Sequence, residues 1–184
     1  MFPVAVGQWW ANPHDAVYDQ ATSLNRVLYV PIWIPSDVSA VDAVEVHVAT
    51  VGAASAVVRL GLHLPHATTK FPDALVVDAG TLDATVTGGT GARQITFAST
   101  AVIPNSLAFV SVVSQGAICT LKYNNTGTWL LAMGVPSSTG LDVLRATNNN
   151  GWYESGVTGG FGATASPTYS SSTAAQPVVG LRRA

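Results

Sequence analysis

The sequence predicts an all-β protein, an antiparallel β-sandwich of jelly-roll type. Strict alternation is the first sign: Val44, Val46 and Val48 alternate with Glu45 and His47, the period of two that a half-buried strand requires. Similar apolar runs recur about every 10 to 14 residues, a spacing typical of sandwiches and jelly rolls. Glycine, proline and asparagine fill the gaps between them, which favours tight turns over long connections.

Read in chain order, the strands begin near residue 26 and continue almost to the end of the chain. Helix signals are weak; we expect at most short helices at 15–28 and 139–145. The expected strands cover residues 44–48, 56–64, 74–77, 80–86, 93–98, 107–113, 118–123 and 178–182.

Composition limits the partners of the chain. Only 10% of its 184 residues are charged, against about 25% in an ordinary soluble domain. A net charge of −2 gives no electrostatic footprint for nucleic acid. No apolar run approaches the ~20 residues of a membrane span, so we expect no membrane insertion. The start of the chain lacks the features of a secretion signal, which predicts folding in the cytoplasm of the producing cell.

The first 24 residues differ from the remainder. They carry Phe2, Trp9, Trp10 and Tyr18 but few strand signals. Such a segment cannot bury these rings by itself, so the rings must dock onto the domain, a neighbouring copy or another protein. We therefore expect residues 1–24 to be an N-terminal anchoring segment and residues 25–184 to be the sandwich domain.

A second group of aromatic residues lies in stretches read as loops. Trp129 belongs to one loop, and Trp152, Tyr153 and Tyr169 belong to an Asn/Gly/Ser-rich stretch at 147–176. Rings on loops of a rigid scaffold are where a sugar or a partner surface could stack, so these four are candidate ligand contacts. The alternative is that they cover the ends of the sandwich.

No catalytic, cofactor or metal site is predicted. Asp78 and Asp83 would lie on opposite faces of an unbroken strand, whereas acid–base catalysis needs convergent carboxylates. His63 and His66 are two ligands where a structural zinc site takes four. The single cysteine, Cys119, lies in an apolar run and is expected to be a buried structural thiol. We therefore expect a protein that is not an enzyme.

The expected strands resemble a β-sandwich module of minor tail, tail-fibre and other appendage proteins of tailed bacteriophages. The resemblance covers about residues 24–184, departs at 63–71, and rests on strand and turn fingerprints in a fixed order. The matching stretches are 25–35 (NRVLYVPIWIP), 57–63, 75–83 (LVVDAGTLD), 94–97 (QITF), 107–116 (LAFVSVVSQG), 154–167 (ESGVTGGFGATASP) and 178–184 (VVGLRRA).

The resemblance implies a virion component on the tail or the capsid surface, bound to other virion proteins and in contact with the host cell surface. It carries over no binding residues, because it concerns the scaffold. A capsid decoration, head-fibre or adaptor protein without a receptor role is one alternative. A carbohydrate-binding module is another, and a host-surface glycan is a further candidate partner.

The strand at 107–113 predicts self-association. Its residues are apolar on both alternating sets, and a strand buried on both faces needs a second covering layer. A copy of the chain is the simplest supplier, which makes Val110 and Val112 candidate interface residues. The resemblance to fibre modules implies a homotrimer.

Overall fold

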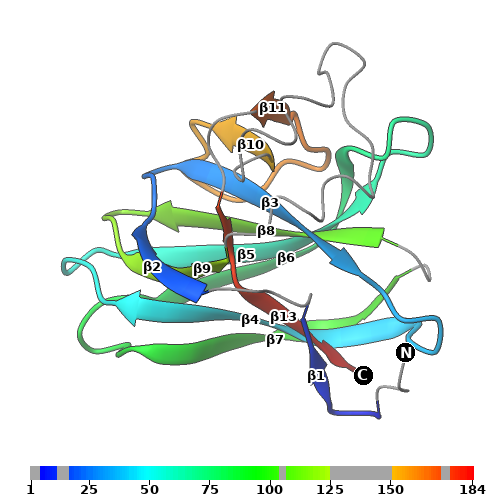
Figure 1. Ribbon diagram of the computed structural model, residues 1–184, viewed down its shortest axis with the longest axis horizontal. Helices are drawn as coiled ribbons and strands as arrows, with labels where there is room; N and C mark the ends of the chain where they lie inside the picture. The colour runs from blue at the N-terminus through cyan, green and yellow to red at the C-terminus, as the bar shows by residue number, and fades with distance from the viewer. Residues whose placement is uncertain (1–4, 12–16, 104–106, 125–150, 171–174) are drawn as a thin grey trace.

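The computed structural model describes residues 5–11, 17–103, 107–124, 151–170 and 175–184. Within these ranges it is an antiparallel β-sandwich, as the sequence predicts. Figure 1 shows β3, β8 and β5 in one layer above β4 and β7 in the other. No helix in the described residues is both long and apolar enough to cross a membrane.

The two sheets have seven and six strands. The seven-stranded sheet contains β1 (Trp9–Trp10), β2 (Val17–Ala21), β4 (Ala40–Thr50), β7 (Gly91–Val102), β9 (Thr120–Asn124), β12 (Gln176–Pro177) and β13 (Val179–Arg183). The six-stranded sheet contains β3 (Arg26–Trp33), β5 (Val57–Pro65), β6 (Pro72–Asp83), β8 (Leu107–Gln115), β10 (Gly151–Ser155) and β11 (Thr168–Ser170), in the order β11-β10-β3-β8-β5-β6.

The main core lies between the sheets and follows from the alternation in the sequence. Val44, Val46 and Val48 of β4 are fully buried there, while Glu45 and His47 between them are only half-buried. Strand β5 contributes Val58, Leu60 and Leu62 from the opposite sheet. The hydrophobic effect therefore selects this register, since a slip by one residue would expose the whole valine set.

Strand β8 is buried on both faces, and the same chain supplies both layers. Val110 and Val112 point into the core between the sheets and are 0% and 3% exposed. Phe109 and Val113 point the other way, into a second cluster that includes Trp152. The expectation that Val110 and Val112 face a neighbouring copy is therefore wrong, because side chains of their own chain already cover them.

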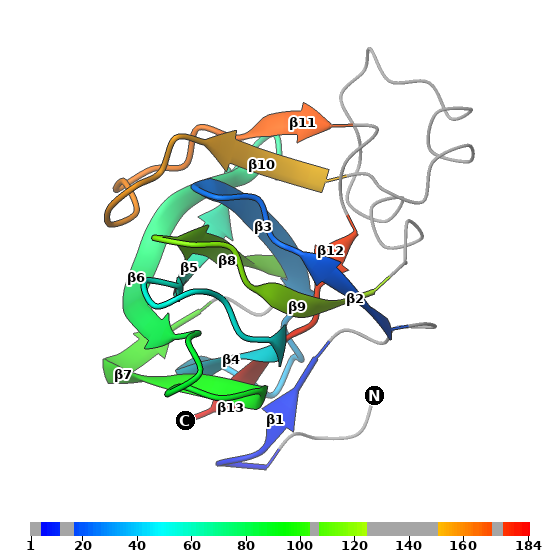
Figure 2. The ribbon, with the colours of Figure 1, turned by 90° about the vertical axis from the view of Figure 1, so that its left-hand side faces the viewer.

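Residues 156–167, here called the cover segment, form the outer layer over the six-stranded sheet. Its start is held by Gln115, whose Nε2 donates to the carbonyl oxygens of Val157 and Gly159 at 3.0 and 2.8 Å. Its far end pairs with β6, where Ala74 bridges to Thr164. Figure 2 shows the chain leaving β10 and passing toward β6 before it reaches β11. The cover segment thus crosses the six-stranded sheet from β10 to β6.

The first 24 residues contribute two strands to the seven-stranded sheet. Strand β1 pairs with β13, and β2 pairs with β9 over five residues. The sequence-based boundary at residue 24 is therefore no boundary of the sheet. The short helix expected at 15–28 is also wrong, because its described part contains β2 and the start of β3. The helix expected at 139–145 lies outside the described residues.

Candidate functional site

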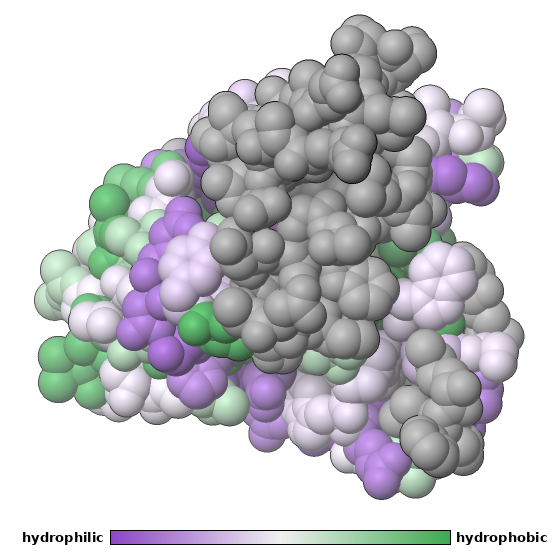
Figure 3. Space-filling model, in the orientation of Figure 1, coloured by the Kyte–Doolittle hydropathy of each residue, from purple (hydrophilic) through white to green (hydrophobic). Residues whose placement is uncertain are grey.

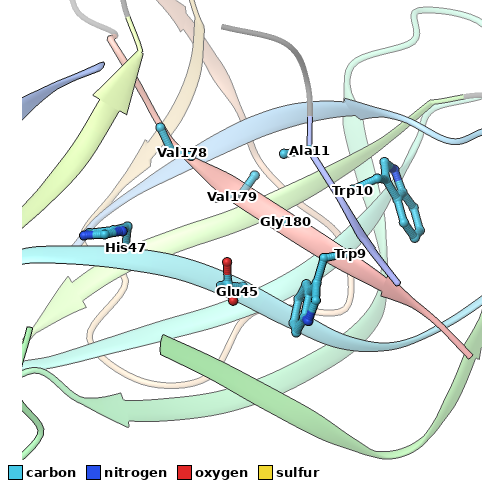
Figure 4. Close-up of a pocket in the computed structure, with 8 residues that line it drawn as sticks. All are labelled: Trp9, Trp10, Ala11, Glu45, His47, Val178, Val179 and Gly180. Carbon is cyan, nitrogen blue, oxygen red and sulfur yellow. The ribbon is translucent and has the colours of Figure 1, made fainter. Parts of the chain in front are cut away.

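Strand β1 places one tryptophan on each side of the seven-stranded sheet. Trp10 lies opposite Leu181, which is fully buried, and it packs against the core. Trp9 lies opposite Arg182, so alternation places Trp9 and Arg182 on the outer face. Figure 4 shows the Trp9 indole beside the Glu45 carboxylate, with Trp10 on the other side of β1.

A groove with a volume of about 230 Å³ opens on this outer face, here called the Trp9 groove. A glycine creates the room: Gly180 of β13 lies opposite Glu45 of β4. A Cβ atom built on Gly180 would lie 3.4 Å from Trp9 Cε3 and 3.9 Å from the Glu45 Cβ, so any larger side chain would extend into the groove. Its lining residues are Trp9, Trp10, Ala11, Glu45, His47, Val178, Val179 and Gly180.

The polar groups of the groove come from β4. Glu45 and His47 are both half-buried, and no hydrogen bond or ion pair within the described residues occupies either side chain. Burial raises the pKa of Glu45, while the nearby His47 acts in the opposite direction. Gln94 of β7 lies opposite Glu45 and continues the polar row across the sheet. The groove thus combines an indole, a carboxylate and an imidazole with open hydrogen-bonding capacity.

The cation beside the groove is already paired. Arg182 donates from Nε to Asp42 Oδ1 at 2.7 Å and from Nη2 to Asp42 Oδ2 at 3.1 Å. Its guanidinium lies 5.6 Å from the centroid of the Trp9 ring, within the range of a cation–π contact. Arg182 is therefore paired with Asp42 and lies over the Trp9 ring without lining the groove itself.

The loop aromatics do not lie in this groove. Trp152 is 1% exposed and packs against Phe71, Phe109 and Tyr169, with ring centroids 5.3, 6.1 and 5.5 Å away. A buried Trp152 cannot be a surface ligand contact, so that expectation is wrong; Trp152 packs in the second cluster on the six-stranded sheet. Trp129 lies outside the described residues.

Tyr153 and Tyr169 are half-buried on β10 and β11. The guanidinium of Arg26 lies 3.9 Å from the centroid of the Tyr153 ring. Tyr169 packs in the second cluster with Trp152, whereas alternation places Tyr153 on the opposite face of β10, level with Leu28. Both tyrosines belong to the six-stranded sheet and lie apart from the Trp9 groove in the strand order.

The predicted anchor residues divide in the structure. The Trp10 indole donates from Nε1 to the carbonyl oxygen of Trp33 at 3.2 Å, so its own chain holds it. Tyr18 lies on β2 with 37% of its surface exposed, and its hydroxyl donates to Gln20 Oε1 at 2.9 Å. Phe2 lies outside the described residues. These residues do not form one contiguous anchor in the described structure.

Contacts within the chain surround the two histidines with metal-like spacing and the single cysteine. His63 is buried between Tyr29 and Phe161, and burial lowers its pKa to about 4. The His66 Nδ1 accepts from the backbone amides of Thr68 and Thr69. In the described part of the chain, no three His, Cys, Asp or Glu side chains gather around a point where a metal could bind. Cys119 is buried, as predicted, and burial raises the pKa of its thiol.

The two aspartates considered for catalysis also have local partners. Asp78 binds Arg59 through two contacts of 2.8 Å, and Asp83 accepts the backbone amide of Thr85 at 2.8 Å. Gly80, with a φ of 90°, follows a bulge at Ala79 that breaks the alternation between the two aspartates.

Comparison with known proteins gives one distant similarity. No protein-family profile matches the chain, and no curated protein matches it. A solved structure of the cysteine protease and lectin-like domains of Cwp84, a surface layer associated protein of Clostridium difficile, aligns with a TM-score of 0.47 and 12% identity. The alignment covers 90% of this chain and 36% of that chain. A likeness at this level assigns no function.

Proposed function

We propose that this chain is a structural virion protein of a tailed bacteriophage, a tail-fibre or minor tail appendage that contacts the host cell surface without catalysis. The observation that carries the proposal is where the bacteriophage-like stretches fall in the fold. They coincide with β3, β5, β6, β7, β8 and β13, and with the cover segment. The resemblance therefore covers the strands that pack in this sandwich and the segment that packs on its six-stranded sheet.

A non-catalytic role is supported by the way the carboxylates are used. Asp42, Asp78 and Asp37 each hold an arginine, and Asp19 pairs with Lys122. Such pairs fix strand edges and connections, which is a structural use of charge. A depolymerase would instead need two carboxylates converging on one bond of the substrate.

A binding role is supported by the Trp9 groove. It lies on the outer face of a rigid sheet, and its indole, carboxylate and imidazole come from strands whose positions are fixed by pairing. Pre-positioned polar groups beside an aromatic ring are what a small ligand site requires. The same feature favours the carbohydrate-binding alternative, in which the chain binds glycans outside a particle; a glycan array on the purified protein examines that alternative.

Immunogold labelling of the bacteriophage particles tests the location. Antibodies raised against the purified chain should label the tail or its fibres. Labelling confined to the capsid would support the decoration or adaptor alternative, and particles free of label would contradict a virion role altogether. Pre-adsorbing the antibodies with the purified protein provides the control, because it should abolish all labelling.

A further inference from the structure

We propose that the Trp9 groove binds one unit of a neutral saccharide, with the ring stacked on Trp9 and two hydroxyl groups donating to Glu45. This inference deepens the proposed function, since it names the ligand class and the site of the host contact. It concerns the isolated protein, and its outcome does not depend on where in a particle the chain lies.

The aromatic wall is supplied by Trp9. Its indole is half-buried, which leaves part of the ring surface facing the groove. The C–H groups on one face of a pyranose ring form an apolar surface that an indole ring covers well, and aromatic side chains contribute large contact areas at small entropic cost. The Arg182 guanidinium lies over one face of the Trp9 ring, 5.6 Å from its centroid, so a saccharide would stack on the surface that Arg182 leaves open.

The hydrogen-bonding wall is supplied by Glu45. An ionised carboxylate has two acceptor oxygens and no donor, which matches the two adjacent hydroxyl donors of a sugar ring. Its partial burial leaves it short of solvent, and no hydrogen bond within the described residues occupies it, while the nearby His47 interacts with its charge. Charge-assisted hydrogen bonds are the stronger kind, so a polyol gains more here than from an exposed carboxylate. The His47 ring offers a further donor or acceptor.

Charge excludes acidic ligands. A uronate or phosphate entering the groove would meet the negative charge of Glu45, while the nearby guanidinium of Arg182 is occupied at Nε and Nη2 by Asp42. Like charges brought together disfavour binding, and the possible counter-charge in the lining, the His47 imidazole, already acts on the Glu45 carboxylate. The expected preference is therefore for neutral sugars over their acidic counterparts.

Size excludes larger occupants. The groove measures about 230 Å³, below the ~300–1,000 Å³ of sites that enclose drug-sized molecules. It suits one sugar unit, with further units extending along the open sheet face. A stable protein partner would instead cover ~800 Å² on each side. Filling the groove would therefore change the affinity of such a partner only slightly.

Binding of methyl glycosides to the purified full chain tests the inference. Methyl glucoside, galactoside, mannoside and N-acetylglucosaminide are titrated by calorimetry and by ¹⁵N-detected shifts, with methyl glucuronide as the acidic probe. At least one neutral glycoside should bind saturably, and the glucuronide should bind at least about tenfold more weakly than its neutral counterpart. No saturable binding by any neutral glycoside, or tighter binding of the glucuronide, would overturn the inference.

Variants locate the site. Gly180→Val fills the groove, Trp9→Ala removes the stacking surface and Glu45→Gln removes the charge while keeping the shape. Each should weaken binding by at least about tenfold. Gly159→Val is the matched control, because a Cβ at Gly159 meets nothing within 4 Å and Gly159 does not line the groove. Unchanged affinity in Glu45→Gln and Trp9→Ala would contradict the site even if Gly180→Val failed to fold. The labelling of particles tests the proposed location in the virion and is independent of these binding measurements.

Discussion

The carboxylate of Asp78 on β6 accepts the backbone amide of Phe161 at 3.1 Å, and so fastens the cover segment to the sheet beneath it. The same carboxylate holds the half-buried guanidinium of Arg59 on β5. Asp78→Asn leaves that guanidinium without a charged partner, so we expect unfolding free energy to fall by about 1–3 kcal/mol. Chemical denaturation measures this loss, and hydrogen exchange at the Phe161 amide should become faster.

Asp83→Asn is the control for Asp78→Asn. Asp83 is exposed and, among the described residues, accepts a hydrogen bond only within its own turn, from Thr85. It should therefore change stability less and leave exchange at Phe161 unaltered. Equal effects of the two substitutions would contradict a fastening role for Asp78.

Acid should destabilise the protein through His63. Burial lowers its pKa to about 4, although the charges of Glu154, Asp78 and Asp73 act in the opposite direction. The folded state therefore keeps His63 neutral while the unfolded chain binds a proton below about pH 6.5, so this stability is complete above pH 6.5 and is lost as pH falls toward 4. The upper limit of the loss is about 3 kcal/mol.

Denaturation at pH 7 and pH 4.5 measures the His63 contribution. His63→Leu should lose less stability than the wild-type protein between the two pH values. An equal loss in both proteins would assign the acid sensitivity to other groups.

Val110→Asp should unfold the chain. Val110 is completely buried between the sheets, and an unpaired charge there costs several kcal/mol. Val102→Asp is the matched control at a position that is 75% exposed, and it should remain folded. Circular dichroism with size-exclusion chromatography distinguishes the two. A folded, dissociated Val110→Asp protein would restore the interface that the sequence predicts at this residue.

The homotrimer stays a prediction, now without Val110 and Val112 as its interface. Low charge still favours self-association, and exposed apolar residues such as Val6 and Val102 are available for it. Figure 3 shows hydrophobic colour mainly toward the left end of the visible face. Light scattering at micromolar concentration should give a trimer, and a monodisperse monomer would contradict the prediction.

The two adjacent tryptophans should have separate roles. Trp10→Ala removes core packing and the hydrogen bond to the Trp33 carbonyl, and we expect a loss of about 2–3 kcal/mol. Trp9→Ala removes an indole from the outer face and should lower the melting temperature much less. If both substitutions destabilised equally, Trp9 would be a packing residue and the groove would lose its aromatic wall.

The sequence predicted strands well where one face is buried and the other is not. The alternation around Val46 is local information, and the hydrophobic effect acts on it in a predictable way. Strands β1 and β2 carry no such alternation. They form because they pair with β13 near residue 182 and with β9 near residue 123, which are distant in the sequence. The sequence also showed that β8 needs two covering layers, but no local pattern says whether the second layer is a neighbour or the cover segment.

The groove shows the same division. Residue type alone singles out Trp9, whereas the alternation of β4 identifies Glu45 and His47 only as the outward residues of a strand. Gly180 had no signal at all, since its role depends on lying opposite Glu45 across 135 residues of sequence. One signal could have suggested the site: Glu45 and His47 point outward between buried valines, and Trp9 has no apparent core position in the sequence.

Adsorption of the bacteriophage particles to host cells tests the central claim most directly. Purified wild-type protein, added in excess before the particles, should occupy the host receptors and slow adsorption in proportion to its concentration. The Gly180→Val protein should not slow adsorption, while the Gly159→Val control should act like the wild type. Unchanged adsorption at saturating wild-type protein would contradict host contact by this chain, and equal inhibition by Gly180→Val would contradict contact through the Trp9 groove.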